Sequence, residues 1–401
     1  MTNSNSPHIP KNILGMEGRE HVRKRPGMYI GGTDSRALHH MVYEVLDHMV
    51  EEALVGRCDQ IWLTLLPDNR ITIRDNSLGL PIEPYADFGL TIMEALLQYL
   101  FAYKSTYEPH TYHVTGGLHG MGLAVVNMLG AQMVVENARD GFLWRQTYRE
   151  GIPQGALEKV RLLDAGERGT SFSFLPDFSV MQLNPFDFDL LAHRCHEIAY
   201  QVSGLTITLR DERVTPAIER SYFTTDGLKS LIQEFNAGSQ PLHEIVYVAQ
   251  EITLPNDTAA KYRIEFAFQF TSSSPSHILS FVNTVETTSG GTHLEGLKAA
   301  ILSVLNEADL YPYDDVTHPP ELTWKMVARG LNAVISVRLA DPIFVSPTKA
   351  LLGNTEIYGP VAGMVYQAFA QKMKSMSYQQ RKAFGKHFFQ PPTSNSPDSA
   401  V

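Results

Sequence analysis

Cysteine and long apolar runs are both scarce in this chain. Its 401 residues include only two cysteines, Cys58 and Cys195. Two thiols so far apart provide neither a disulfide framework nor a zinc-ligand spacing, so we expect buried thiols in a reducing compartment. No apolar run reaches the ~18 residues of a membrane span, and the polar N-terminus lacks the apolar core of a signal peptide. These absences predict a cytoplasmic protein with no membrane partner.

Basic residues are in deficit as well. The chain holds 33 Lys and Arg against 43 Asp and Glu, which gives a net charge of −10. Proteins that coat nucleic acid need clustered basic side chains for the phosphates. The acidic charge balance therefore argues against a protein that coats nucleic acid nonspecifically. Contact with DNA is only a weak expectation, limited to a local basic groove.

Hydrophobic residues make up 43% of the chain and charged residues 19%, as in ordinary globular proteins. The length favours two domains, and mixed strand and helix patterns in both halves predict an α+β fold. We place a flexible arm, a first domain, a second domain and a disordered tail at residues 1–15, 16–220, 221–388 and 389–401.

Several elements can be predicted from periodicity. In the first domain the clearest are a helix at 35–54, capped by Thr33, Asp34 or Ser35, and strands at 61–66 and 71–75. In the second, residues 262–270 alternate as a half-buried strand. A Thr292-x-x-Glu295 capping box opens a helix, and a long helix covers 356–386.

One face of the first helix carries His40, Glu44, His48 and Glu51 at spacings of four, four and three. A solvated face would explain such a stripe. A functional site would explain it too, because a carboxylate beside a histidine can hold and activate a water.

Asp75 ends a strand and opens the sequence Asp-Asn-Ser-Leu-Gly79. A carboxylate there could accept the exocyclic amine of adenine, and Gly79 could let a ligand approach the backbone. An ordinary turn is the alternative.

The stretch Thr115–Gly122 has four glycines and leads into a helix. Backbone N–H groups at a helix N-terminus can surround a triphosphate. The Gly-Lys-Ser/Thr ending of a P-loop is missing, and a structural hinge is the alternative reading. By spacing alone, Asp341–Lys349 is an exposed loop with a surface lysine.

Taken in order, five motifs resemble the ATPase and transducer regions of DNA gyrase B and its topoisomerase IV relative, members of the GHKL ATPase group. The similarity runs from about residue 12 to about 385. The motifs are Val22–Gly31 (VRKRPGMYIG), Leu38–Glu44 (LHHMVYE), Gly116–Gly120 (GGLHG), Gly290–Leu294 (GGTHL) and Asp341–Lys349 (DPIFVSPTK).

This resemblance implies a GHKL (Bergerat) α/β sandwich followed by a transducer domain of the ribosomal-S5-like type. It implies ATP and Mg²⁺ as ligands and a homodimer that closes when ATP binds. Glu44 matches the general base, His40 its orienting neighbour, and Lys349 the transducer lysine that reaches the γ-phosphate.

Asp75, with Gly79 and Thr170, matches the adenine site. Arg145 and Pro81 match the rim where aminocoumarins bind. The phosphate contacts and the lid match the residues Lys104, Tyr112, Gly116, Gly117, Leu118, His119, Gly120, Met121 and Gly122.

The chain departs from the family pattern near the chemistry. His48 stands where the family has an asparagine that binds Mg²⁺, and imidazole suits Mg²⁺ poorly. Ser77 and Leu78 replace a glycine and an arginine. Ala102 and Tyr103 replace two glycines, and Pro347 replaces a glutamine. No tyrosine occurs in the first 28 residues, although the family arm often carries one.

The Glu-Gly-Asp-Ser motif of the family's DNA-cleaving module does not occur in the sequence. The Pro/Ser-rich tail resembles a natural terminus, and we expect that this chain alone does not cut DNA.

Three functions follow as hypotheses. The first is an ATP-hydrolysing dimerisation clamp that acts in or on type II topoisomerase function. The second is a hydrolysis-deficient nucleotide-binding clamp or regulator of a topoisomerase or gyrase subunit. The third, and least favoured, is a transition-metal site formed by His40, Glu44 and His48.

Overall fold

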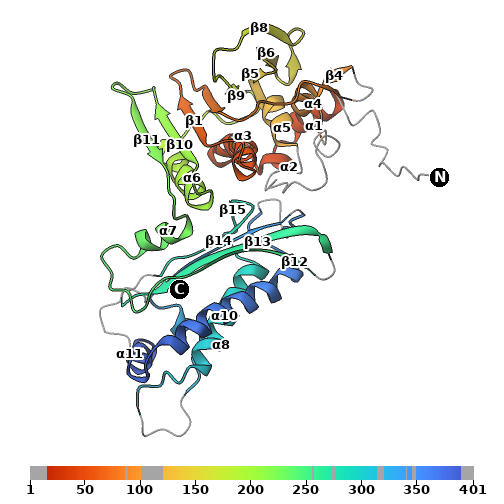
Figure 1. The fold of residues 1–401 in the computed structure, drawn as a ribbon. Coiled ribbons are helices and arrows are strands. Elements are labelled where there is room, and N and C mark those ends of the chain that lie inside the picture. Colours follow the sequence, from red (N-terminus) through yellow and green to blue (C-terminus); the bar gives the residue numbers. More distant parts are fainter. Residues whose placement is uncertain are drawn as a thin grey trace, which may run out of the picture. The chain divides into compact units, whose positions relative to one another are not determined.

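The computed structural model describes residues 16–85, 89–100, 121–254, 257–272, 276–313, 320–339, 341–345 and 349–389. These residues form two compact units that divide between Thr225 and Asp226. Strands and helices mix in both units, which confirms the α+β prediction (Figure 1). Among the described residues, no helix combines the length and apolar character needed to cross a lipid bilayer.

The first unit is built on one large sheet. Its described strands run in the order β11-β10-β1-β2-β9-β5-β6-β7, and β8 pairs with β6. The helices are α1 Met16–Lys24, α2 Gly27–Ile30, α3 Ser35–Leu54, α4 Ile92–Gln98, α5 Gly122–Leu129 and α6 Phe188–Gln201. The strands are β1 Gln60–Leu65, β2 Ile71–Asp75, β3 Pro84–Tyr85, β4 Leu90–Thr91, β5 Gly130–Arg139, β6 Phe142–Arg149, β7 Ile152–Pro153, β8 Glu158–Leu162, β9 Gly169–Pro176, β10 Thr206–Asp211 and β11 Ile218–Tyr222.

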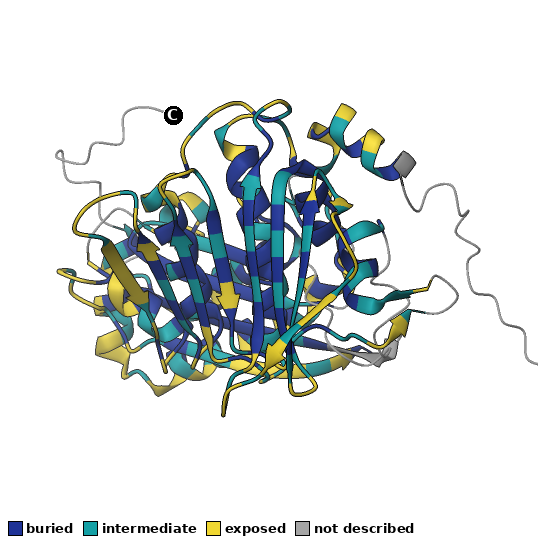
Figure 2. Cartoon of the chain, turned by 90° about the horizontal axis from the view of Figure 1, so that it is seen from above, coloured by how far each residue is buried: buried dark blue, intermediate teal, exposed yellow. Residues whose placement is uncertain are grey.

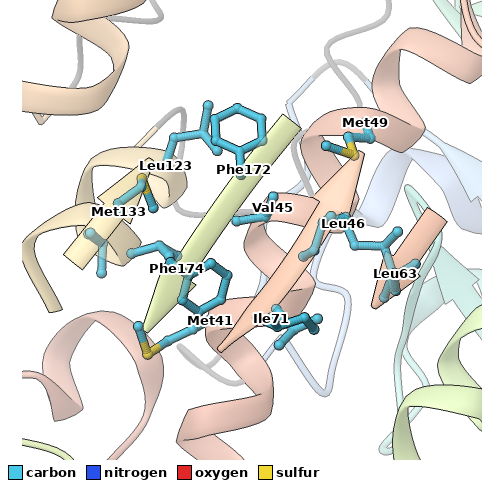
Figure 3. Close-up of a cluster of buried hydrophobic side chains, with 14 of the residues drawn as sticks. Met41, Val45, Leu46, Met49, Leu63, Ile71, Leu123, Met133, Phe172 and Phe174 are labelled. Atoms are coloured by element: carbon cyan, nitrogen blue, oxygen red, sulfur yellow. The ribbon is translucent and has the colours of Figure 1, made fainter. Parts of the chain in front are cut away.

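Helix α3 is the helix predicted at 35–54, and Asp34 is its cap: the carboxylate accepts the backbone N–H of Ala37 at 3.0 Å. Its apolar face packs on the sheet (Figure 3). Met41, Val45, Leu46 and Met49 are fully buried, as are their partners on the strands, Leu63, Ile71, Phe172 and Phe174. This packing fixes which way the polar face of α3 points.

The second unit has a five-stranded sheet in the order β12-β13-β16-β14-β15. Helices α8 and α10 lie together on one face of it (Figure 1). The elements are α7 Leu228–Phe235, β12 Val246–Leu254, β13 Asp257–Phe270, β14 Ile278–Val282, β15 Val285–Glu286, α8 Thr292–Glu307, α9 Trp324–Val327, β16 Leu331–Arg338, η4 Thr355–Ile357, α10 Tyr358–Ser375 and α11 Tyr378–Phe389. Strand β13 buries Ile264, Phe266, Phe268 and Phe270 on one face, as its alternation predicts. The prediction of a half-buried strand is wrong, because Glu265, Ala267 and Gln269 on the other face are buried as well.

Buried residues gather on the strands, and exposed residues lie mainly on loops and on outer helix faces (Figure 2). Both cysteines are buried, and burial raises the pKa of Cys58 to about 11 and that of Cys195 to about 12. These thiols are therefore protonated and unreactive near neutral pH.

Two helix predictions in the second unit are also wrong. Thr292 is the first residue of α8 and not its cap, because Gly291 precedes the helix and the Thr292 hydroxyl donates to the carbonyl of Asn354 instead. The helix predicted over 356–386 is two helices. Ser377 and Gln380 exchange hydrogen bonds as a capping box that starts α11. Helix α10 therefore ends at Ser375, and a new helix begins at Tyr378.

Two glycines of the second unit test its packing. A methyl group on Gly385 would lie 1.6 Å from the carbonyl oxygen of Leu310, whereas one on Gly363 in α10 would meet nothing within 4 Å. We expect Gly385→Ala to lower the free energy of unfolding by at least ~1–3 kcal/mol. Gly363→Ala should raise it by ~0.5–1 kcal/mol, because alanine favours helix.

Denaturant unfolding of the two variants measures both effects. Equal stabilities would show that α11 does not pack on Leu310 as described.

Candidate nucleotide site

Asp75 lies at the end of β2, where the sheet buries its side chain almost completely. The carboxylate oxygen Oδ1 accepts three hydrogen bonds: from the Thr170 N–H at 2.8 Å, the Ser77 hydroxyl at 3.0 Å and the Ser77 N–H at 3.2 Å. Burial raises the pKa of Asp75, and these bonds oppose the rise. The bonds hold Oδ1 in place, so the carboxyl group has one fixed orientation.

Ser77, where the family has a glycine, is part of this arrangement. It is buried, and its hydroxyl both donates to Asp75 and accepts the N–H of Gly79 at 3.3 Å. Gly79 has a φ of 79°, and a methyl group on it would lie 2.5 Å from the carbonyl oxygen of Ala138. The turn after Asp75 therefore needs a glycine at 79, whereas the serine at 77 adds a bond to the carboxylate.

Two residues that the sequence did not single out hold the same turn. The Asn137 amide, fully buried on β5, accepts the Leu80 N–H at 2.7 Å and donates to the Leu80 carbonyl at 2.9 Å. Its oxygen also accepts the Thr170 hydroxyl. Arg139 donates to the Gly79 carbonyl at 3.1 Å. A buried asparagine within a strand is a usable signal, but only once the strand's inward face is known.

Arg145 lies elsewhere on the sheet, where it pairs with Glu136 at 2.6 Å across β5 and β6. Arg139, rather than Arg145, contacts the turn that follows Asp75. The match of Arg145 and Pro81 to an inhibitor rim remains a prediction.

The polar residues predicted on one face of α3 lie near two other elements of the unit, α5 and the end of β2. A methyl group on Gly122, the first residue of α5, would lie 2.3 Å from Oε2 of Glu44, so the Glu44 carboxylate lies directly against the Gly122 backbone. One turn later His48 lies edge-on to the Phe172 ring, with centroids 6.3 Å apart. Burial lowers the pKa of His48 below its ordinary value, and the nearby carboxylates of Glu52 and Asp75 oppose that fall only in part.

Glu44 therefore lies against Gly122, and His48, one turn later on α3, lies near Asp75. Asp75, Thr170, Gly79, His48, Glu44 and Gly122 belong to one continuous region of the first unit. His40 precedes Glu44 by one turn, and its ring meets that of Tyr43 at 5.7 Å. Met121, just before α5, is buried.

A salt bridge on a neighbouring face of α3 also fixes the helix. Arg194 of α6 donates to Asp47 at 3.0 Å, and both side chains are about nine-tenths buried. The guanidinium also lies 5.8 Å from the Tyr43 ring centroid. Breaking a buried pair leaves an uncompensated charge, so this contact strongly restrains the rotation of α3.

Other predicted residues are not placed in this region. Lys104, Tyr112 and Gly116–Gly120 lie outside the described residues, as do Ala102, Tyr103 and Pro347. Lys349 belongs to the second unit, with a φ of 56°.

The described part of the chain gives the transition-metal hypothesis no support. No three His, Cys, Asp or Glu side chains converge there in a metal-binding arrangement.

The His48 position does not fit Mg²⁺. This ion prefers hard oxygen ligands in octahedral geometry, whereas His48 offers an imidazole, whose ring lies edge-on to that of Phe172.

Both units of the chain match known proteins. Residues 33–179 match the family model for the histidine kinase-, DNA gyrase B- and HSP90-like ATPase, and residues 227–390 match the family model for DNA gyrase B. The DNA gyrase B protein of Haloferax volcanii is 37% identical over 358 residues, which cover 88% of this chain and 55% of the relative. That of Clostridium acetobutylicum is 36% identical over 367 residues, 91% of this chain and 56% of the relative. The chain therefore spans about half the length of these relatives.

A solved structure is similar over almost its whole length. It is the 43K ATPase domain of Thermus thermophilus gyrase B in complex with an aminocoumarin, with 28% identity and a TM-score of 0.74. The similarity covers 93% of this chain and 94% of that one. With both family models matched in order and the fold shared, this chain is a member of the DNA gyrase B family with a GHKL-type ATPase fold.

Proposed function

We propose that the first unit binds ATP, with the adenine amine donating to Asp75. The observation that carries this proposal is the buried Asp75 carboxylate. Three donors hold Oδ1, and a carboxylate has further acceptor capacity on its second oxygen. An N–H donor on a ligand would satisfy that oxygen. The GHKL-type fold and the gyrase B relatives support adenine as the group that supplies the donor.

We propose that the bound ATP is hydrolysed. Glu44 accepts a proton from a water whose oxygen forms a bond to the γ-phosphorus, while the bond from that phosphorus to the β–γ bridging oxygen breaks. ADP and phosphate leave. The contact of Glu44 with Gly122 supports this role, because Gly122 is the N-terminus of α5, where backbone N–H groups attract anions. His40 orients Glu44, and Lys349 stabilises the charge that develops on the phosphate.

The alternative function is a clamp that binds ATP without turning it over. One observation favours it: the imidazole at position 48 does not fit Mg²⁺. In this alternative the nucleotide changes the conformation of the chain, and hydrolysis does not follow.

The larger assembly is part of the same proposal. The matched relatives are DNA gyrase B proteins, and this chain spans about half their length. We propose a first domain at 16–220 and a second at 221–388, with a homodimer that closes on ATP. The clamp acts in or on type II topoisomerase function, with a topoisomerase or gyrase subunit as partner and DNA contact as a minor feature.

Two substitutions separate binding from hydrolysis. Glu44→Ala should abolish ATP turnover and leave nucleotide affinity within a few-fold, because Glu44 acts on the attacking water. Asp75→Asn should weaken ATP binding by at least ~10-fold, since the loss of a charged acceptor costs ~1.5–3 kcal/mol. A phosphate-release assay and a fluorescent-nucleotide titration measure the two effects. Unchanged turnover in Glu44→Ala would rule out the mechanism.

The residue at 48 can be tested through metal dependence. His48→Asn introduces an amide oxygen at the position where the family binds Mg²⁺. We expect Mg²⁺ to strengthen ATP binding more in this variant than in the parent chain, and turnover to rise with it. Titrations of ATP with Mg²⁺ and with a chelator measure the difference. If Mg²⁺ strengthens binding equally in both proteins, His48 does not impair metal binding.

The contact between α5 and Glu44 gives a third test. Gly122→Ala places a methyl group where Oε2 of Glu44 now lies, and a flexible side chain can move away. We therefore expect little change in melting temperature but a loss of turnover of at least ~10-fold, since a ~1 Å misplacement can cost ~100-fold. Wild-type turnover in Gly122→Ala would show that the orientation of Glu44 against α5 does not matter.

A further inference from the structure

Lys349 lies at the end of a short hairpin in the second unit, whose described arms are residues 341–345 and 349–354. The Val345 N–H donates to the Leu351 carbonyl at 3.0 Å, and the Gly353 N–H donates to the Ile343 carbonyl at 2.7 Å. Phe344 and Leu352 pair as an antiparallel bridge between these bonds. We refer to these arms as the lysine hairpin.

The lysine hairpin docks edge-on to the turn that precedes α8. The Ser289 N–H donates to the Ala350 carbonyl at 2.8 Å, and the Leu352 N–H donates to the Gly290 carbonyl at 3.1 Å. Gly291 has a φ of 139°, and a methyl group there would lie 2.6 Å from both the N and O atoms of Leu352. The absence of a side chain at Gly291 thus lets the two backbones meet. The second arm of the hairpin is fixed from Ala350, immediately after Lys349.

One buried side chain closes the base of the lysine hairpin. Asn354 is 3% exposed, and its Oδ1 accepts the Ile343 N–H at 2.6 Å. Its Nδ2 donates to the Asp341 carbonyl at 3.3 Å and to Glu356 at 2.7 Å. The backbone carbonyl of Asn354 accepts a hydrogen bond from the Thr292 hydroxyl at 2.7 Å. Asn354 therefore ties both arms to each other and to the first residue of α8.

We propose that Asn354 is a positioning residue for Lys349. It acts through the hairpin base and touches neither nucleotide nor reacting atoms. Only an amide both accepts and donates in this way at a single buried position. The inference rests on the proposed function, in which the lysine ammonium stabilises charge on the γ-phosphate. When the arm that begins at Lys349 is held rigidly, the ammonium group of the lysine keeps one position. Electrostatic stabilisation of a transition state requires a charge that is positioned in advance.

The same unit offers a matched control at the opposite end of β16. Asn332 is 2% exposed, accepts the His277 N–H at 2.8 Å and donates to Asn236 at 2.6 Å. It is a buried amide with comparable bonds, and these lead to His277 and Asn236 rather than to the described arms of the lysine hairpin. Asn332→Ala therefore removes similar stabilisation without loosening the base of the hairpin.

The experiment compares Asn354→Ala, the milder Thr292→Val and Asn332→Ala in the full chain. Hydrogen exchange of residues 341–354, ATP turnover and fluorescent-nucleotide affinity are measured for each. We expect faster exchange and a turnover at least ~10-fold lower in Asn354→Ala, because a ~1 Å misplacement can cost ~100-fold. Affinity should stay within about twofold if catalysis depends on geometry that is productive only in the transition state. Thr292→Val should show the same changes, but smaller.

Adding Lys349→Ala to Asn354→Ala should lower turnover by less than adding it to Asn332→Ala, where the substitution should have its full effect. Wild-type exchange in the hairpin of Asn354→Ala overturns the proposal, whether or not the chain hydrolyses ATP. Faster exchange with wild-type turnover overturns it too, as does an equal loss of turnover in Asn332→Ala. If the parent chain shows no turnover or does not respond to Lys349→Ala, the proposed function fails, and hydrogen exchange alone then decides whether Asn354 anchors the hairpin.

Discussion

The packing of α3 on the sheet is the constraint on which the candidate site depends. Each of its buried apolar side chains stabilises the fold by ~1.5–3 kcal/mol, so several together far outweigh any single polar contact. Rotating the helix by one residue, about 100°, would expose that face. The hydrophobic stripe therefore decides, without any catalytic requirement, that Glu44 meets Gly122 and that His48 lies near Asp75.

Polar groups then fix what hydrophobic packing leaves free. The salt bridge between Asp47 and Arg194 joins α3 to α6, and the amide of Asn137 holds the turn that follows Asp75. Burying an unpaired polar group is costly, so such groups are retained in a core when they are fully bonded. The first unit combines a strong, nonspecific packing force with a few directional bonds that set side-chain orientation. The lysine hairpin uses the same combination in the second unit.

Much of the fold could be predicted from the sequence, because α3 and the buried strands have clear periodicity. The resemblance to gyrase B also predicted Asp75 and Glu44 as neighbours of one site, which periodicity could not do. The errors have a local physical cause. Thr292 satisfies the capping-box pattern, but Asn354, distant in sequence, takes its hydroxyl. The break before α11 had a signal, Ser377-x-x-Gln380, within a longer helical pattern that hid it. Ser77 and Arg139 act through contacts that no single-sequence pattern displays.

Recognition of the adenine amine by Asp75 is tested most directly by a comparison of two nucleotides. Inosine triphosphate is ATP with a carbonyl oxygen in place of the exocyclic amine, so it would face the Asp75 carboxylate with an acceptor. Calorimetric titration of the parent chain should show ATP binding at least ~10-fold more tightly, since an unpaired buried group costs ~1–3 kcal/mol or more. Equal affinities for the two nucleotides would contradict the account, because the carboxylate that the sheet buries and orients would then not recognise adenine.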